Sequence, residues 1–235
     1  MKVKVFPVVL LSLGVLAAYA SAGVRGTAHD FVMRIPELSG YADKDLCRFC
    51  HLLGVPGPTA TLPPLYNLYQ SPTLRAVVQQ PNGSSRDCLV CHDGAFALGS
   101  IWASYIGRRL PLGPVSERVS LGGDLSDDHP VSFVYDSSLA RRKSGLADPS
   151  TLPRQVRLDS RGRLQCTTCH NPHEERFSKF LVVDNSVSQL CTSCHRFQSA
   201  GNSYHTSTNT TACGSCHRVH GGSERLLTSP LRRLR

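Results

Sequence analysis

Aromatic side chains are scarce in this chain. Phenylalanine, tyrosine and tryptophan make up 7% of its 235 residues, and Trp102 is the single tryptophan. Chains of modest size bury proportionally little of their surface, so this composition does not predict a conventional hydrophobic core. The fold needs another source of stability, such as a covalently attached or metal-bound group.

Cysteine is absent outside one repeated motif. All ten cysteines belong to five copies of Cys-x-x-Cys-His. The copies are Cys47, Cys50 and His51; Cys88, Cys91 and His92; Cys166, Cys169 and His170; Cys191, Cys194 and His195; and Cys213, Cys216 and His217. This is the attachment motif of a c-type haem, in which both thiols bond to the porphyrin and the histidine ligates the iron. The sequence therefore predicts five covalently bound haem c groups.

The motif has other interpretations, which the residues leave open. A Cys-x-x-Cys pair can carry out thiol chemistry or supply half of a zinc site, and an exported chain can use cysteines as a disulfide scaffold. None of these requires histidine directly after every second cysteine. Chance would place it there in all five copies in about one case in several million. The spacing therefore favours haem over zinc or disulfides.

The histidines match the predicted haems in number. The chain has ten histidines, of which five lie outside the motifs. These five are His29, His129, His173, His205 and His220. Five irons need ten axial ligands, so the simplest interpretation makes every iron bis-histidine. Met33 is a rival ligand for one haem, because methionine also ligates haem iron, but a plain apolar role is favoured for it.

Two of the additional histidines closely follow a motif. His173 and His220 lie three residues after His170 and His217. Side chains three apart on a helical turn share one face, whereas the two axial ligands of an iron stand on opposite faces. We therefore expect His173 and His220 each to reach a neighbouring haem.

The remaining three are placed by weaker signals. His129 precedes Pro130, which restricts it to extended backbone, and a nearby carboxylate could take the other ring N–H and fix the orientation of the ring. His205 lies shortly before the fifth motif and is expected to ligate a haem of the C-terminal cluster. For His29 three roles stay open: a ligand within its own chain, a ligand donated to a neighbouring molecule, or a free side chain.

The first 22 residues have the composition of a secretory signal peptide. Lys2 and Lys4 precede an apolar stretch over residues 5–16, and residues 20–22 form a small-residue cleavage site. An uncleaved membrane anchor is the alternative, since the stretch is near the lower length limit for a span. Export fits covalent haem attachment, which takes place outside the cytoplasm. The prediction is a periplasmic or extracellular protein.

The formal net charge of +9 does not indicate a nucleic-acid partner. Two lysines leave with the signal peptide, and the propionates of bound haems would offset most of the remainder. A basic tail over residues 223–235 could dock an acidic protein or a membrane surface, so any membrane contact would be peripheral.

Motif spacing predicts two haem-bearing parts. Residues 23–143 would hold two haems and residues 165–222 a compact three-haem cluster, with a linker and hairpin over residues 144–164 between them. The expected fold class is mostly irregular, with short α-helices and little β-structure, and with the haems forming the core.

Local patterns predict a few regular elements. A proline near its start predicts a helix over residues 71–83, and alternating residues predict a strand over residues 131–135. Further expectations are helices over 94–106 and 186–198, a hairpin over 156–164, and loops over 53–64 and 144–153.

Five short blocks of the sequence occur in an order that resembles a known protein family. They are AHDF at 28–31, CRFCH at 47–51, CLVCHDG at 88–94, LSDDHPVSF at 125–133 and CTTCHNPH at 166–173. In this the chain resembles the multihaem c-type cytochromes of the doubled CXXCH class, loosely related to cytochrome c3. The resemblance covers most of the chain beyond the signal peptide. It implies an exported electron carrier in respiration with metals or other external acceptors.

The resemblance also carries two qualifications. Some similar proteins polymerise into haem-lined filaments in which a histidine of one subunit ligates a haem of the next, and His29 is the residue whose position would suit this. Similar proteins often have a second histidine soon after the first motif, but here Leu52, Leu53 and Gly54 follow His51. That haem would be completed from elsewhere.

The predicted function is electron transfer without catalysis, between redox partner proteins or terminal electron acceptors. A multihaem reductase of a nitrogen or sulfur oxyanion is the first alternative, and it would need one iron with an open position. No Cys-x-x-Cys-Lys variant occurs, and the histidines suffice to fill every iron. A subunit of a haem-lined filament is the second alternative.

Overall fold

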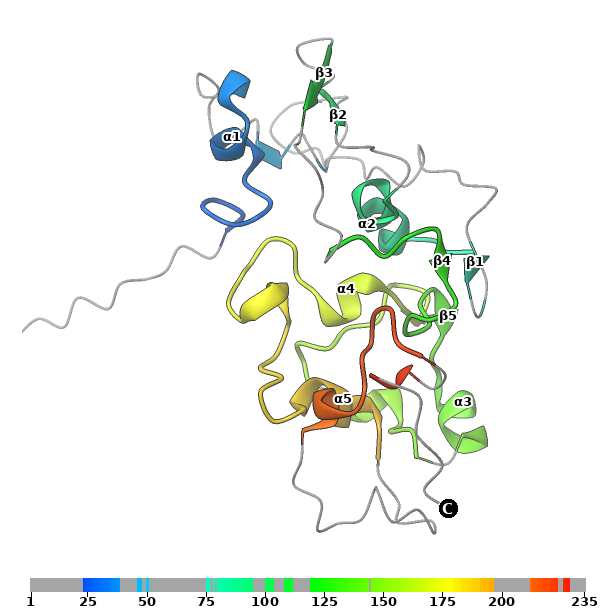
Figure 1. Ribbon diagram of the computed structural model, residues 1–235. Coiled ribbons are helices and arrows are strands. Elements are labelled where there is room, and N and C mark those ends of the chain that lie inside the picture. The colour runs from blue at the N-terminus through cyan, green and yellow to red at the C-terminus, as the bar shows by residue number, and fades with distance from the viewer. Residues whose placement is uncertain are drawn as a thin grey trace, which may run out of the picture.

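The described chain is mostly irregular, with short helices and little strand, which confirms the expected secondary-structure content (Figure 1). The core of haems stays a prediction. The computed structural model describes residues 23–38, 46–47, 50, 75–76, 78, 80–94, 100–103, 108–111, 119–143, 145–196, 212–223 and 226–228. The predicted signal peptide, the loop over residues 53–64 and the end of the basic tail lie outside the described residues.

Regular elements are short throughout the described chain. The helices are α1 (Phe31–Arg34), α2 (Ser84–His92), α3 (Ser137–Arg142), α4 (Cys166–Cys169) and α5 (Gln189–Cys194). Single 3-10 turns are η1 (Pro36–Leu38), η4 (Pro149–Thr151), η5 (Ser178–Phe180) and η7 (Cys213–Ser215). The strands are β1 (Arg75–Ala76), β2 (Ser100–Ala103), β3 (Arg108–Pro111), β4 (Asp124–Leu125), β5 (Phe133–Val134) and β6 (Arg163–Leu164). They form three two-stranded pairs, β1 with β4 in parallel, and β2 with β3 and β5 with β6 antiparallel.

Helices α2 and α4 pack against each other, although they are far apart in the sequence (Figure 1). The hydroxyls of Ser84 and Thr167 hydrogen-bond across this contact at 2.7 Å. Gly83, the residue before α2, has a φ of 53°, and a Cβ atom there would lie 2.9 Å from Nε2 of Gln165. Glycine meets both demands, because it accepts positive φ and lets the two segments approach closely.

The side chain of Gln165 is the centre of a buried polar network. It is fully buried, and its Oε1 accepts hydrogen bonds from Ser85 Oγ at 2.6 Å and Ser132 Oγ at 2.9 Å. Its Nε2 donates to Asn82 Oδ1 at 3.1 Å and to Asp159 Oδ2 at 2.9 Å. One amide therefore has four partners on three stretches of chain, at residues 82–85, 132 and 159, and all its hydrogen-bonding capacity on the side chain is used.

Asp159 anchors the turn that leads into this network. Its carboxylate accepts from the backbone N–H groups of Arg161 and Arg163, both at 2.9 Å, and pairs with the Arg163 guanidinium at 2.8 Å. Partial burial raises the pKa of Asp159, but hydrogen bonds from Arg163, Gln165 and Arg161 outweigh it and bring the pKa to about 2. The carboxylate therefore stays ionised across the physiological range.

Some predicted elements are present in altered form. The strand expected over 131–135 is confirmed as β5, but it is only two residues long. The turn of the expected hairpin is present, with Gly162 N–H donating to Asp159 O, yet β6 pairs with β5 and not with the chain just before the turn. The helix expected over 186–198 is confirmed only as the shorter α5.

Two helix predictions are wrong where the structure describes them. Residues 75–76 of the helix expected over 71–83 form β1, which pairs with β4. Residues 100–103 of the helix expected over 94–106 form β2, which pairs with β3. Pairing with a distant segment outweighs local helix preference, and β2 contains the β-branched and aromatic residues Ile101 and Trp102 that suit a strand.

The segment predicted as a linker contacts the fourth motif. The N–H of Ala147 donates to Cys194 O at 2.7 Å, and that of Arg196 donates to Gly145 O at 2.6 Å. Tyr135 Oη also donates to Ala147 O at 2.5 Å. The division into two haem-bearing parts stays a prediction.

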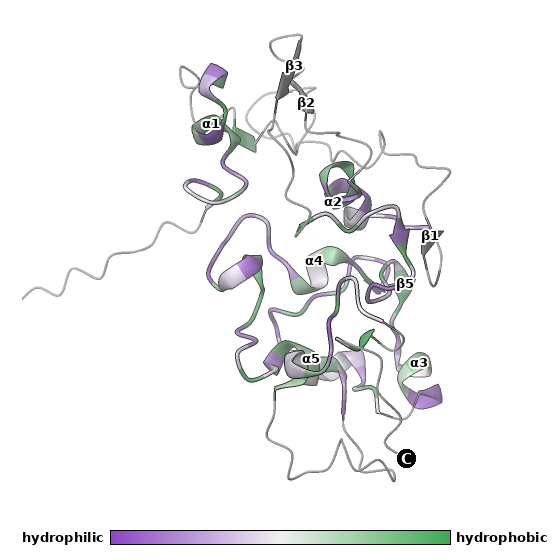
Figure 2. Cartoon of the chain, viewed as in Figure 1, coloured by the Kyte–Doolittle hydropathy of each residue, from purple (hydrophilic) through white to green (hydrophobic). Residues whose placement is uncertain are grey.

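Apolar packing within the described residues is thin, as the composition predicts. One cluster joins Leu89, Val90 and Leu125, with Cys91 and Leu121 packed against it. Figure 2 shows apolar and polar residues interleaved along the described chain. No helix in this part of the chain is both long and apolar enough to cross a membrane.

Replacing Gln165 with alanine should lower the free energy of unfolding by about 3 kcal/mol, because it leaves several buried polar partners without a hydrogen bond. Urea unfolding of the full chain, followed by far-ultraviolet circular dichroism, measures this. Gln189→Ala, at an exposed position in α5, is the matched control and should shift the midpoint little. Equal midpoints for the two variants would show that the network contributes no stability.

Candidate functional site

Each described motif is wound into about one helical turn. The N–H of the motif histidine donates to the carbonyl of the first cysteine in three copies, at 3.0 Å for His170, 2.9 Å for His195 and 2.8 Å for His217. The second motif lies at the carboxyl end of α2. Residues three and four apart on a turn share a face, so both thiols and the imidazole of a motif are directed to one side.

Three pairs of imidazole rings face each other. Each pair joins a motif histidine to one from outside the motifs, with ring centroids 6.2 Å apart in all three. The pairs are His92 with His29, His195 with His129, and His170 with His220. The interplanar angles differ, at 88°, 81° and 30°, so the rings share a separation and not an orientation.

The separation fits two rings on opposite sides of one metal ion. An imidazole nitrogen ligates a first-row metal at about 2.0–2.1 Å and lies roughly 1.1 Å from its ring centre, so two such rings have centres about 6.3 Å apart. Ordinary aromatic contacts span about 4.5–7 Å, so a single pair would mean little. The same separation in three independent pairs, each with one motif histidine, fits an iron between the rings.

Hydrogen bonds to Nδ1 orient four of the six rings. Nδ1 of His92 lies 2.8 Å from the carbonyl oxygen of Val119, and Nδ1 of His170 lies 2.8 Å from that of Lys179. In His129 it lies 3.0 Å from Pro130 O, and in His220 it lies 3.0 Å from Asp128 Oδ1. With a proton on Nδ1 held by each acceptor, Nε2 keeps its lone pair for a metal.

Burial lowers the pKa of four of the paired rings, His29, His129, His170 and His195, and so favours their neutral form. Neutral imidazole is the form that binds metals. Nδ1 of His29 is also buried and has no hydrogen-bond partner.

An apolar cavity adjoins the third motif. It contains the thiol-bearing Cys166 and the ring of His220 among apolar side chains. Its other lining residues are Val78, Leu89, Leu121, Leu125, Asp128, His129, Pro130 and Val131. A porphyrin attached at Cys166 needs this kind of apolar surface beside its anchor.

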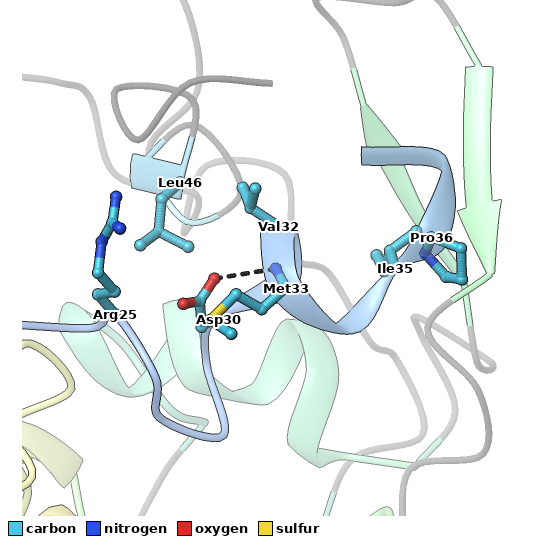
Figure 3. Close-up of a pocket in the computed structure, with 7 residues that line it drawn as sticks. All are labelled: Arg25, Asp30, Val32, Met33, Ile35, Pro36 and Leu46. Carbon is cyan, nitrogen blue, oxygen red and sulfur yellow. Dashed lines mark hydrogen bonds between the residues drawn. The ribbon is translucent and has the colours of Figure 1, made fainter. Parts of the chain in front are cut away.

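Helix α1 positions His29. Asp30 caps the helix, its carboxylate accepting from Met33 N–H at 3.1 Å and Gly26 N–H at 2.7 Å, and it is almost fully buried (Figure 3). The His29 ring packs on Phe180 with centroids 4.6 Å apart. Because His29 faces His92 of the same chain, the geometry supports the first of its three open roles, a ligand within its own chain.

Met33 is not packed in a core. It lines a pocket of about 290 Å³ beside Leu46, which precedes the first motif (Figure 3). Its side chain is 74% exposed. The plain apolar role favoured from the sequence therefore does not involve burial.

The segment at η5 ties two of the ring pairs together. Lys179 supplies the carbonyl that orients His170, and Phe180 packs on His29. Both residues have positive φ, 62° and 58°, in the left-handed region that non-glycine residues seldom adopt. Strain of this kind persists where the surrounding structure imposes it. Here the strained backbone places Lys179 beside His170 and Phe180 beside His29.

The carboxylate expected beside His129 serves a different ring. Asp128 bonds to His220, while His129 uses the Pro130 carbonyl. The prediction was wrong because residues 127–129 run against residues 219–222, with His129 N–H donating to Val219 O at 2.8 Å and Gly222 N–H to Asp127 O at 3.0 Å. No local spacing reveals that contact.

Not every predicted site residue can be placed. His51 and His205 lie outside the described residues. His173 is exposed and His217 is half-buried, and the charge of His217 is close enough to lower the pKa of His195 after the larger effect of burial. Sequence reasoning missed Ser85, Gln165 and Ser188, all buried next to motifs.

Burial and neighbouring thiols shift the pKa values of the motif cysteines in both directions. All ten cysteines are free, and burial raises the pKa of Cys91 to about 11 and that of Cys169 to about 12, whereas reactive Cys-x-x-Cys thiols have lowered values. Cys88 and Cys166 hydrogen-bond to each other, which raises the pKa of Cys88 and lowers that of Cys166. Among the described residues, no group of three or more His, Cys, Asp or Glu is arranged to hold a metal ion.

Comparison with known families finds the doubled CXXCH motif over residues 160–200, which include the third and fourth motifs. No curated protein matches the chain. The match supports the class of multihaem c-type cytochromes, and the motifs indicate covalently bound haem c.

The left-handed backbone at Lys179 yields a prediction. Lys179→Val should lower the thermal midpoint by several degrees, because a β-branched side chain adds to a left-handed cost of about 1–2 kcal/mol. The thermal midpoint of Lys179→Gly should equal or slightly exceed that of the parent chain. Differential scanning calorimetry of the intact protein compares the three, and a valine variant as stable as the glycine variant would contradict the imposed φ.

Proposed function

We propose that the chain is an exported pentahaem c-type cytochrome whose bis-histidine sites relay electrons between redox partners. The observation that carries the proposal is the recurrence of a 6.2 Å imidazole pair at the second, third and fourth motifs. Bound haem supplies one-electron redox chemistry at each site. The chain's own cysteines would anchor that group, and its histidines would ligate it.

The proposed roles follow the motifs. Covalent attachment falls to the ten motif cysteines, and one axial position at each site to the motif histidine. The opposite position falls to His29 at the second site, His220 at the third and His129 at the fourth. By count, His173 and His205 are left to complete the first and fifth sites with His51 and His217.

The ring pairs favour a carrier over a reductase. Each of the three pairs offers two imidazoles, which leaves no open axial position for a substrate at those sites. They also favour sites completed within one chain, since His29 faces a ring of its own chain. Bis-histidine ligation without methionine predicts low reduction potentials.

Export, location and partners are part of the proposal. The signal-like N-terminus supports a periplasmic or extracellular protein, and the basic tail supports docking of an acidic redox partner.

Intact-mass measurement of the mature protein tests the proposal directly. The expected mass is that of the polypeptide from residue 23 onward plus five haems. A polypeptide with no added mass would overturn it. Fewer than five haems would overturn the pentahaem count and keep the class.

Removing one outer histidine should open one iron. His129→Ala should convert one haem from low-spin to high-spin in the ferric electron paramagnetic resonance spectrum, with the haem content unchanged, because the covalent bonds and motif histidine remain. Met33→Leu is the control and should leave the spectrum unchanged. An unaltered low-spin spectrum for His129→Ala would exclude this residue as a ligand.

Asp128 should tune the third site. Its carboxylate accepts from His220 and makes that imidazole a stronger donor to ferric iron, so Asp128→Asn should raise one midpoint potential. A tenfold change in the redox equilibrium corresponds to about 59 mV for one electron, which potentiometric titration resolves. Asp127→Asn, at the exposed neighbouring aspartate, should leave all midpoints in place.

A further inference from the structure

Two stretches of the sequence share a longer pattern than the haem motif alone. Asn82, Ser85 and Cys88 are spaced by three, and the same residue types recur at Asn185, Ser188 and Cys191. Both stretches thus read Asn-x-x-Ser-x-x-Cys-x-x-Cys-His. The second and fourth motifs carry this extension; before the third motif the equivalent position is Arg163, which pairs with Asp159.

The two serines make the same contact in the structure. Ser85 Oγ accepts a hydrogen bond from the backbone N–H of Cys166 at 3.0 Å. Ser188 Oγ accepts one from the backbone N–H of Cys213 at 2.7 Å. Both serines are buried, at 0% and 4% exposed. Each serine thus lies three residues before the first cysteine of one motif and binds the first cysteine of the next.

The contact brings sulfur atoms of successive motifs together. The side chains of Cys88 and Cys166 are within hydrogen-bonding reach of each other, and so are those of Cys191 and Cys213. Since a c-type haem is attached through these sulfur atoms, neighbouring first cysteines place two attachment sites side by side. Among the described residues, the third and fourth motifs have no such contact; instead, the segments that carry their outer histidines, His220 and His129, are joined by the hydrogen bond from His129 N–H to Val219 O.

The local backbone differs between the two copies while the contact is kept. Ser85 lies within the first turn of α2, whereas Ser188 precedes α5 and has a φ of 66°. A serine in the left-handed region costs conformational energy, so the surrounding structure must hold Ser188 in this conformation. Retention of the same acceptor in both backbones indicates that the hydroxyl contact is what the two copies share.

We propose that Ser85 and Ser188 are positioning residues that dock the first cysteine of the following motif, and so build two equivalent pairs of haem sites, the second with the third and the fourth with the fifth. The inference rests on the proposed function for the haems. It groups the motifs differently from the two-haem and three-haem parts predicted from spacing, and it leaves the first motif as the unpaired member.

Amide hydrogen exchange in the haem-loaded, reduced protein tests the two contacts separately by nuclear magnetic resonance. Ser85→Ala should speed exchange of the Cys166 amide by about five- to tenfold and leave Cys213 unchanged. Ser188→Ala should do the reverse, so each variant is the control for the other. Ser186→Ala, at an exposed serine near α5, should change neither amide.

The pairing has its own spectroscopic signature. Coupling between neighbouring haems appears in the Soret circular dichroism, and each serine variant should alter it while the number of haems by mass stays the same. The double variant should show the sum of the two changes, because the sites are separate. Variants with unchanged exchange and unchanged Soret dichroism would overturn the inference, as would two variants that affect both amides equally.

The haem content of the variants and of the parent chain distinguishes failure of this inference from failure of the proposed function. If Ser85→Ala loses haem, peptide mapping should find the loss at the third motif, and loss spread over all motifs would count against a positioning role. A parent chain without haem would overturn the proposed function itself. A fully loaded parent chain whose variants behave as it does would overturn this inference alone.

Discussion

The structure depends on one buried amide. Gln165 directly precedes the third motif, and its side chain bonds to Ser85 and Ser132 through the oxygen and to Asn82 and Asp159 through the nitrogen. The one apolar cluster beside α2 among the described residues is small, so packing contributes little to holding α2 against α4. A saturated polar network in a low-dielectric interior can do so, because every lost bond leaves a buried group unpaired.

The candidate sites depend on a second long-range contact. Residues 127–129 hydrogen-bond to residues 219–222, so the backbones of His129 and His220 are neighbours. Their rings nevertheless face different motif histidines, His195 and His170. The long stretch between the second and third motifs therefore contributes residues to the candidate sites of the C-terminal motifs. Asp128 adds the acceptor that orients His220.

Local sequence signals succeeded where the cause is local. The turn at 159–162 follows from Asp159 accepting the N–H groups that come just after it, and α5 forms where a helix was expected. They failed where a distant partner decides: residues 75–76 and 100–103 became strands because β4 and β3 pair with them. The Asn-x-x-Ser extension was readable in the sequence, but its meaning depended on seeing which backbone amide each serine binds.

The sequence by itself determined the chemistry of this protein. Five motifs of cysteine and histidine, and no cysteine elsewhere, specify covalent haem attachment, because one helical turn suffices to gather two thiols and an imidazole. The tertiary structure alone decided which distant histidine faces which motif, since His29, His129 and His220 reach their partners across many residues of irregular chain. No periodic pattern encodes such contacts; long-range hydrogen bonds such as that from His129 N–H to Val219 O set them.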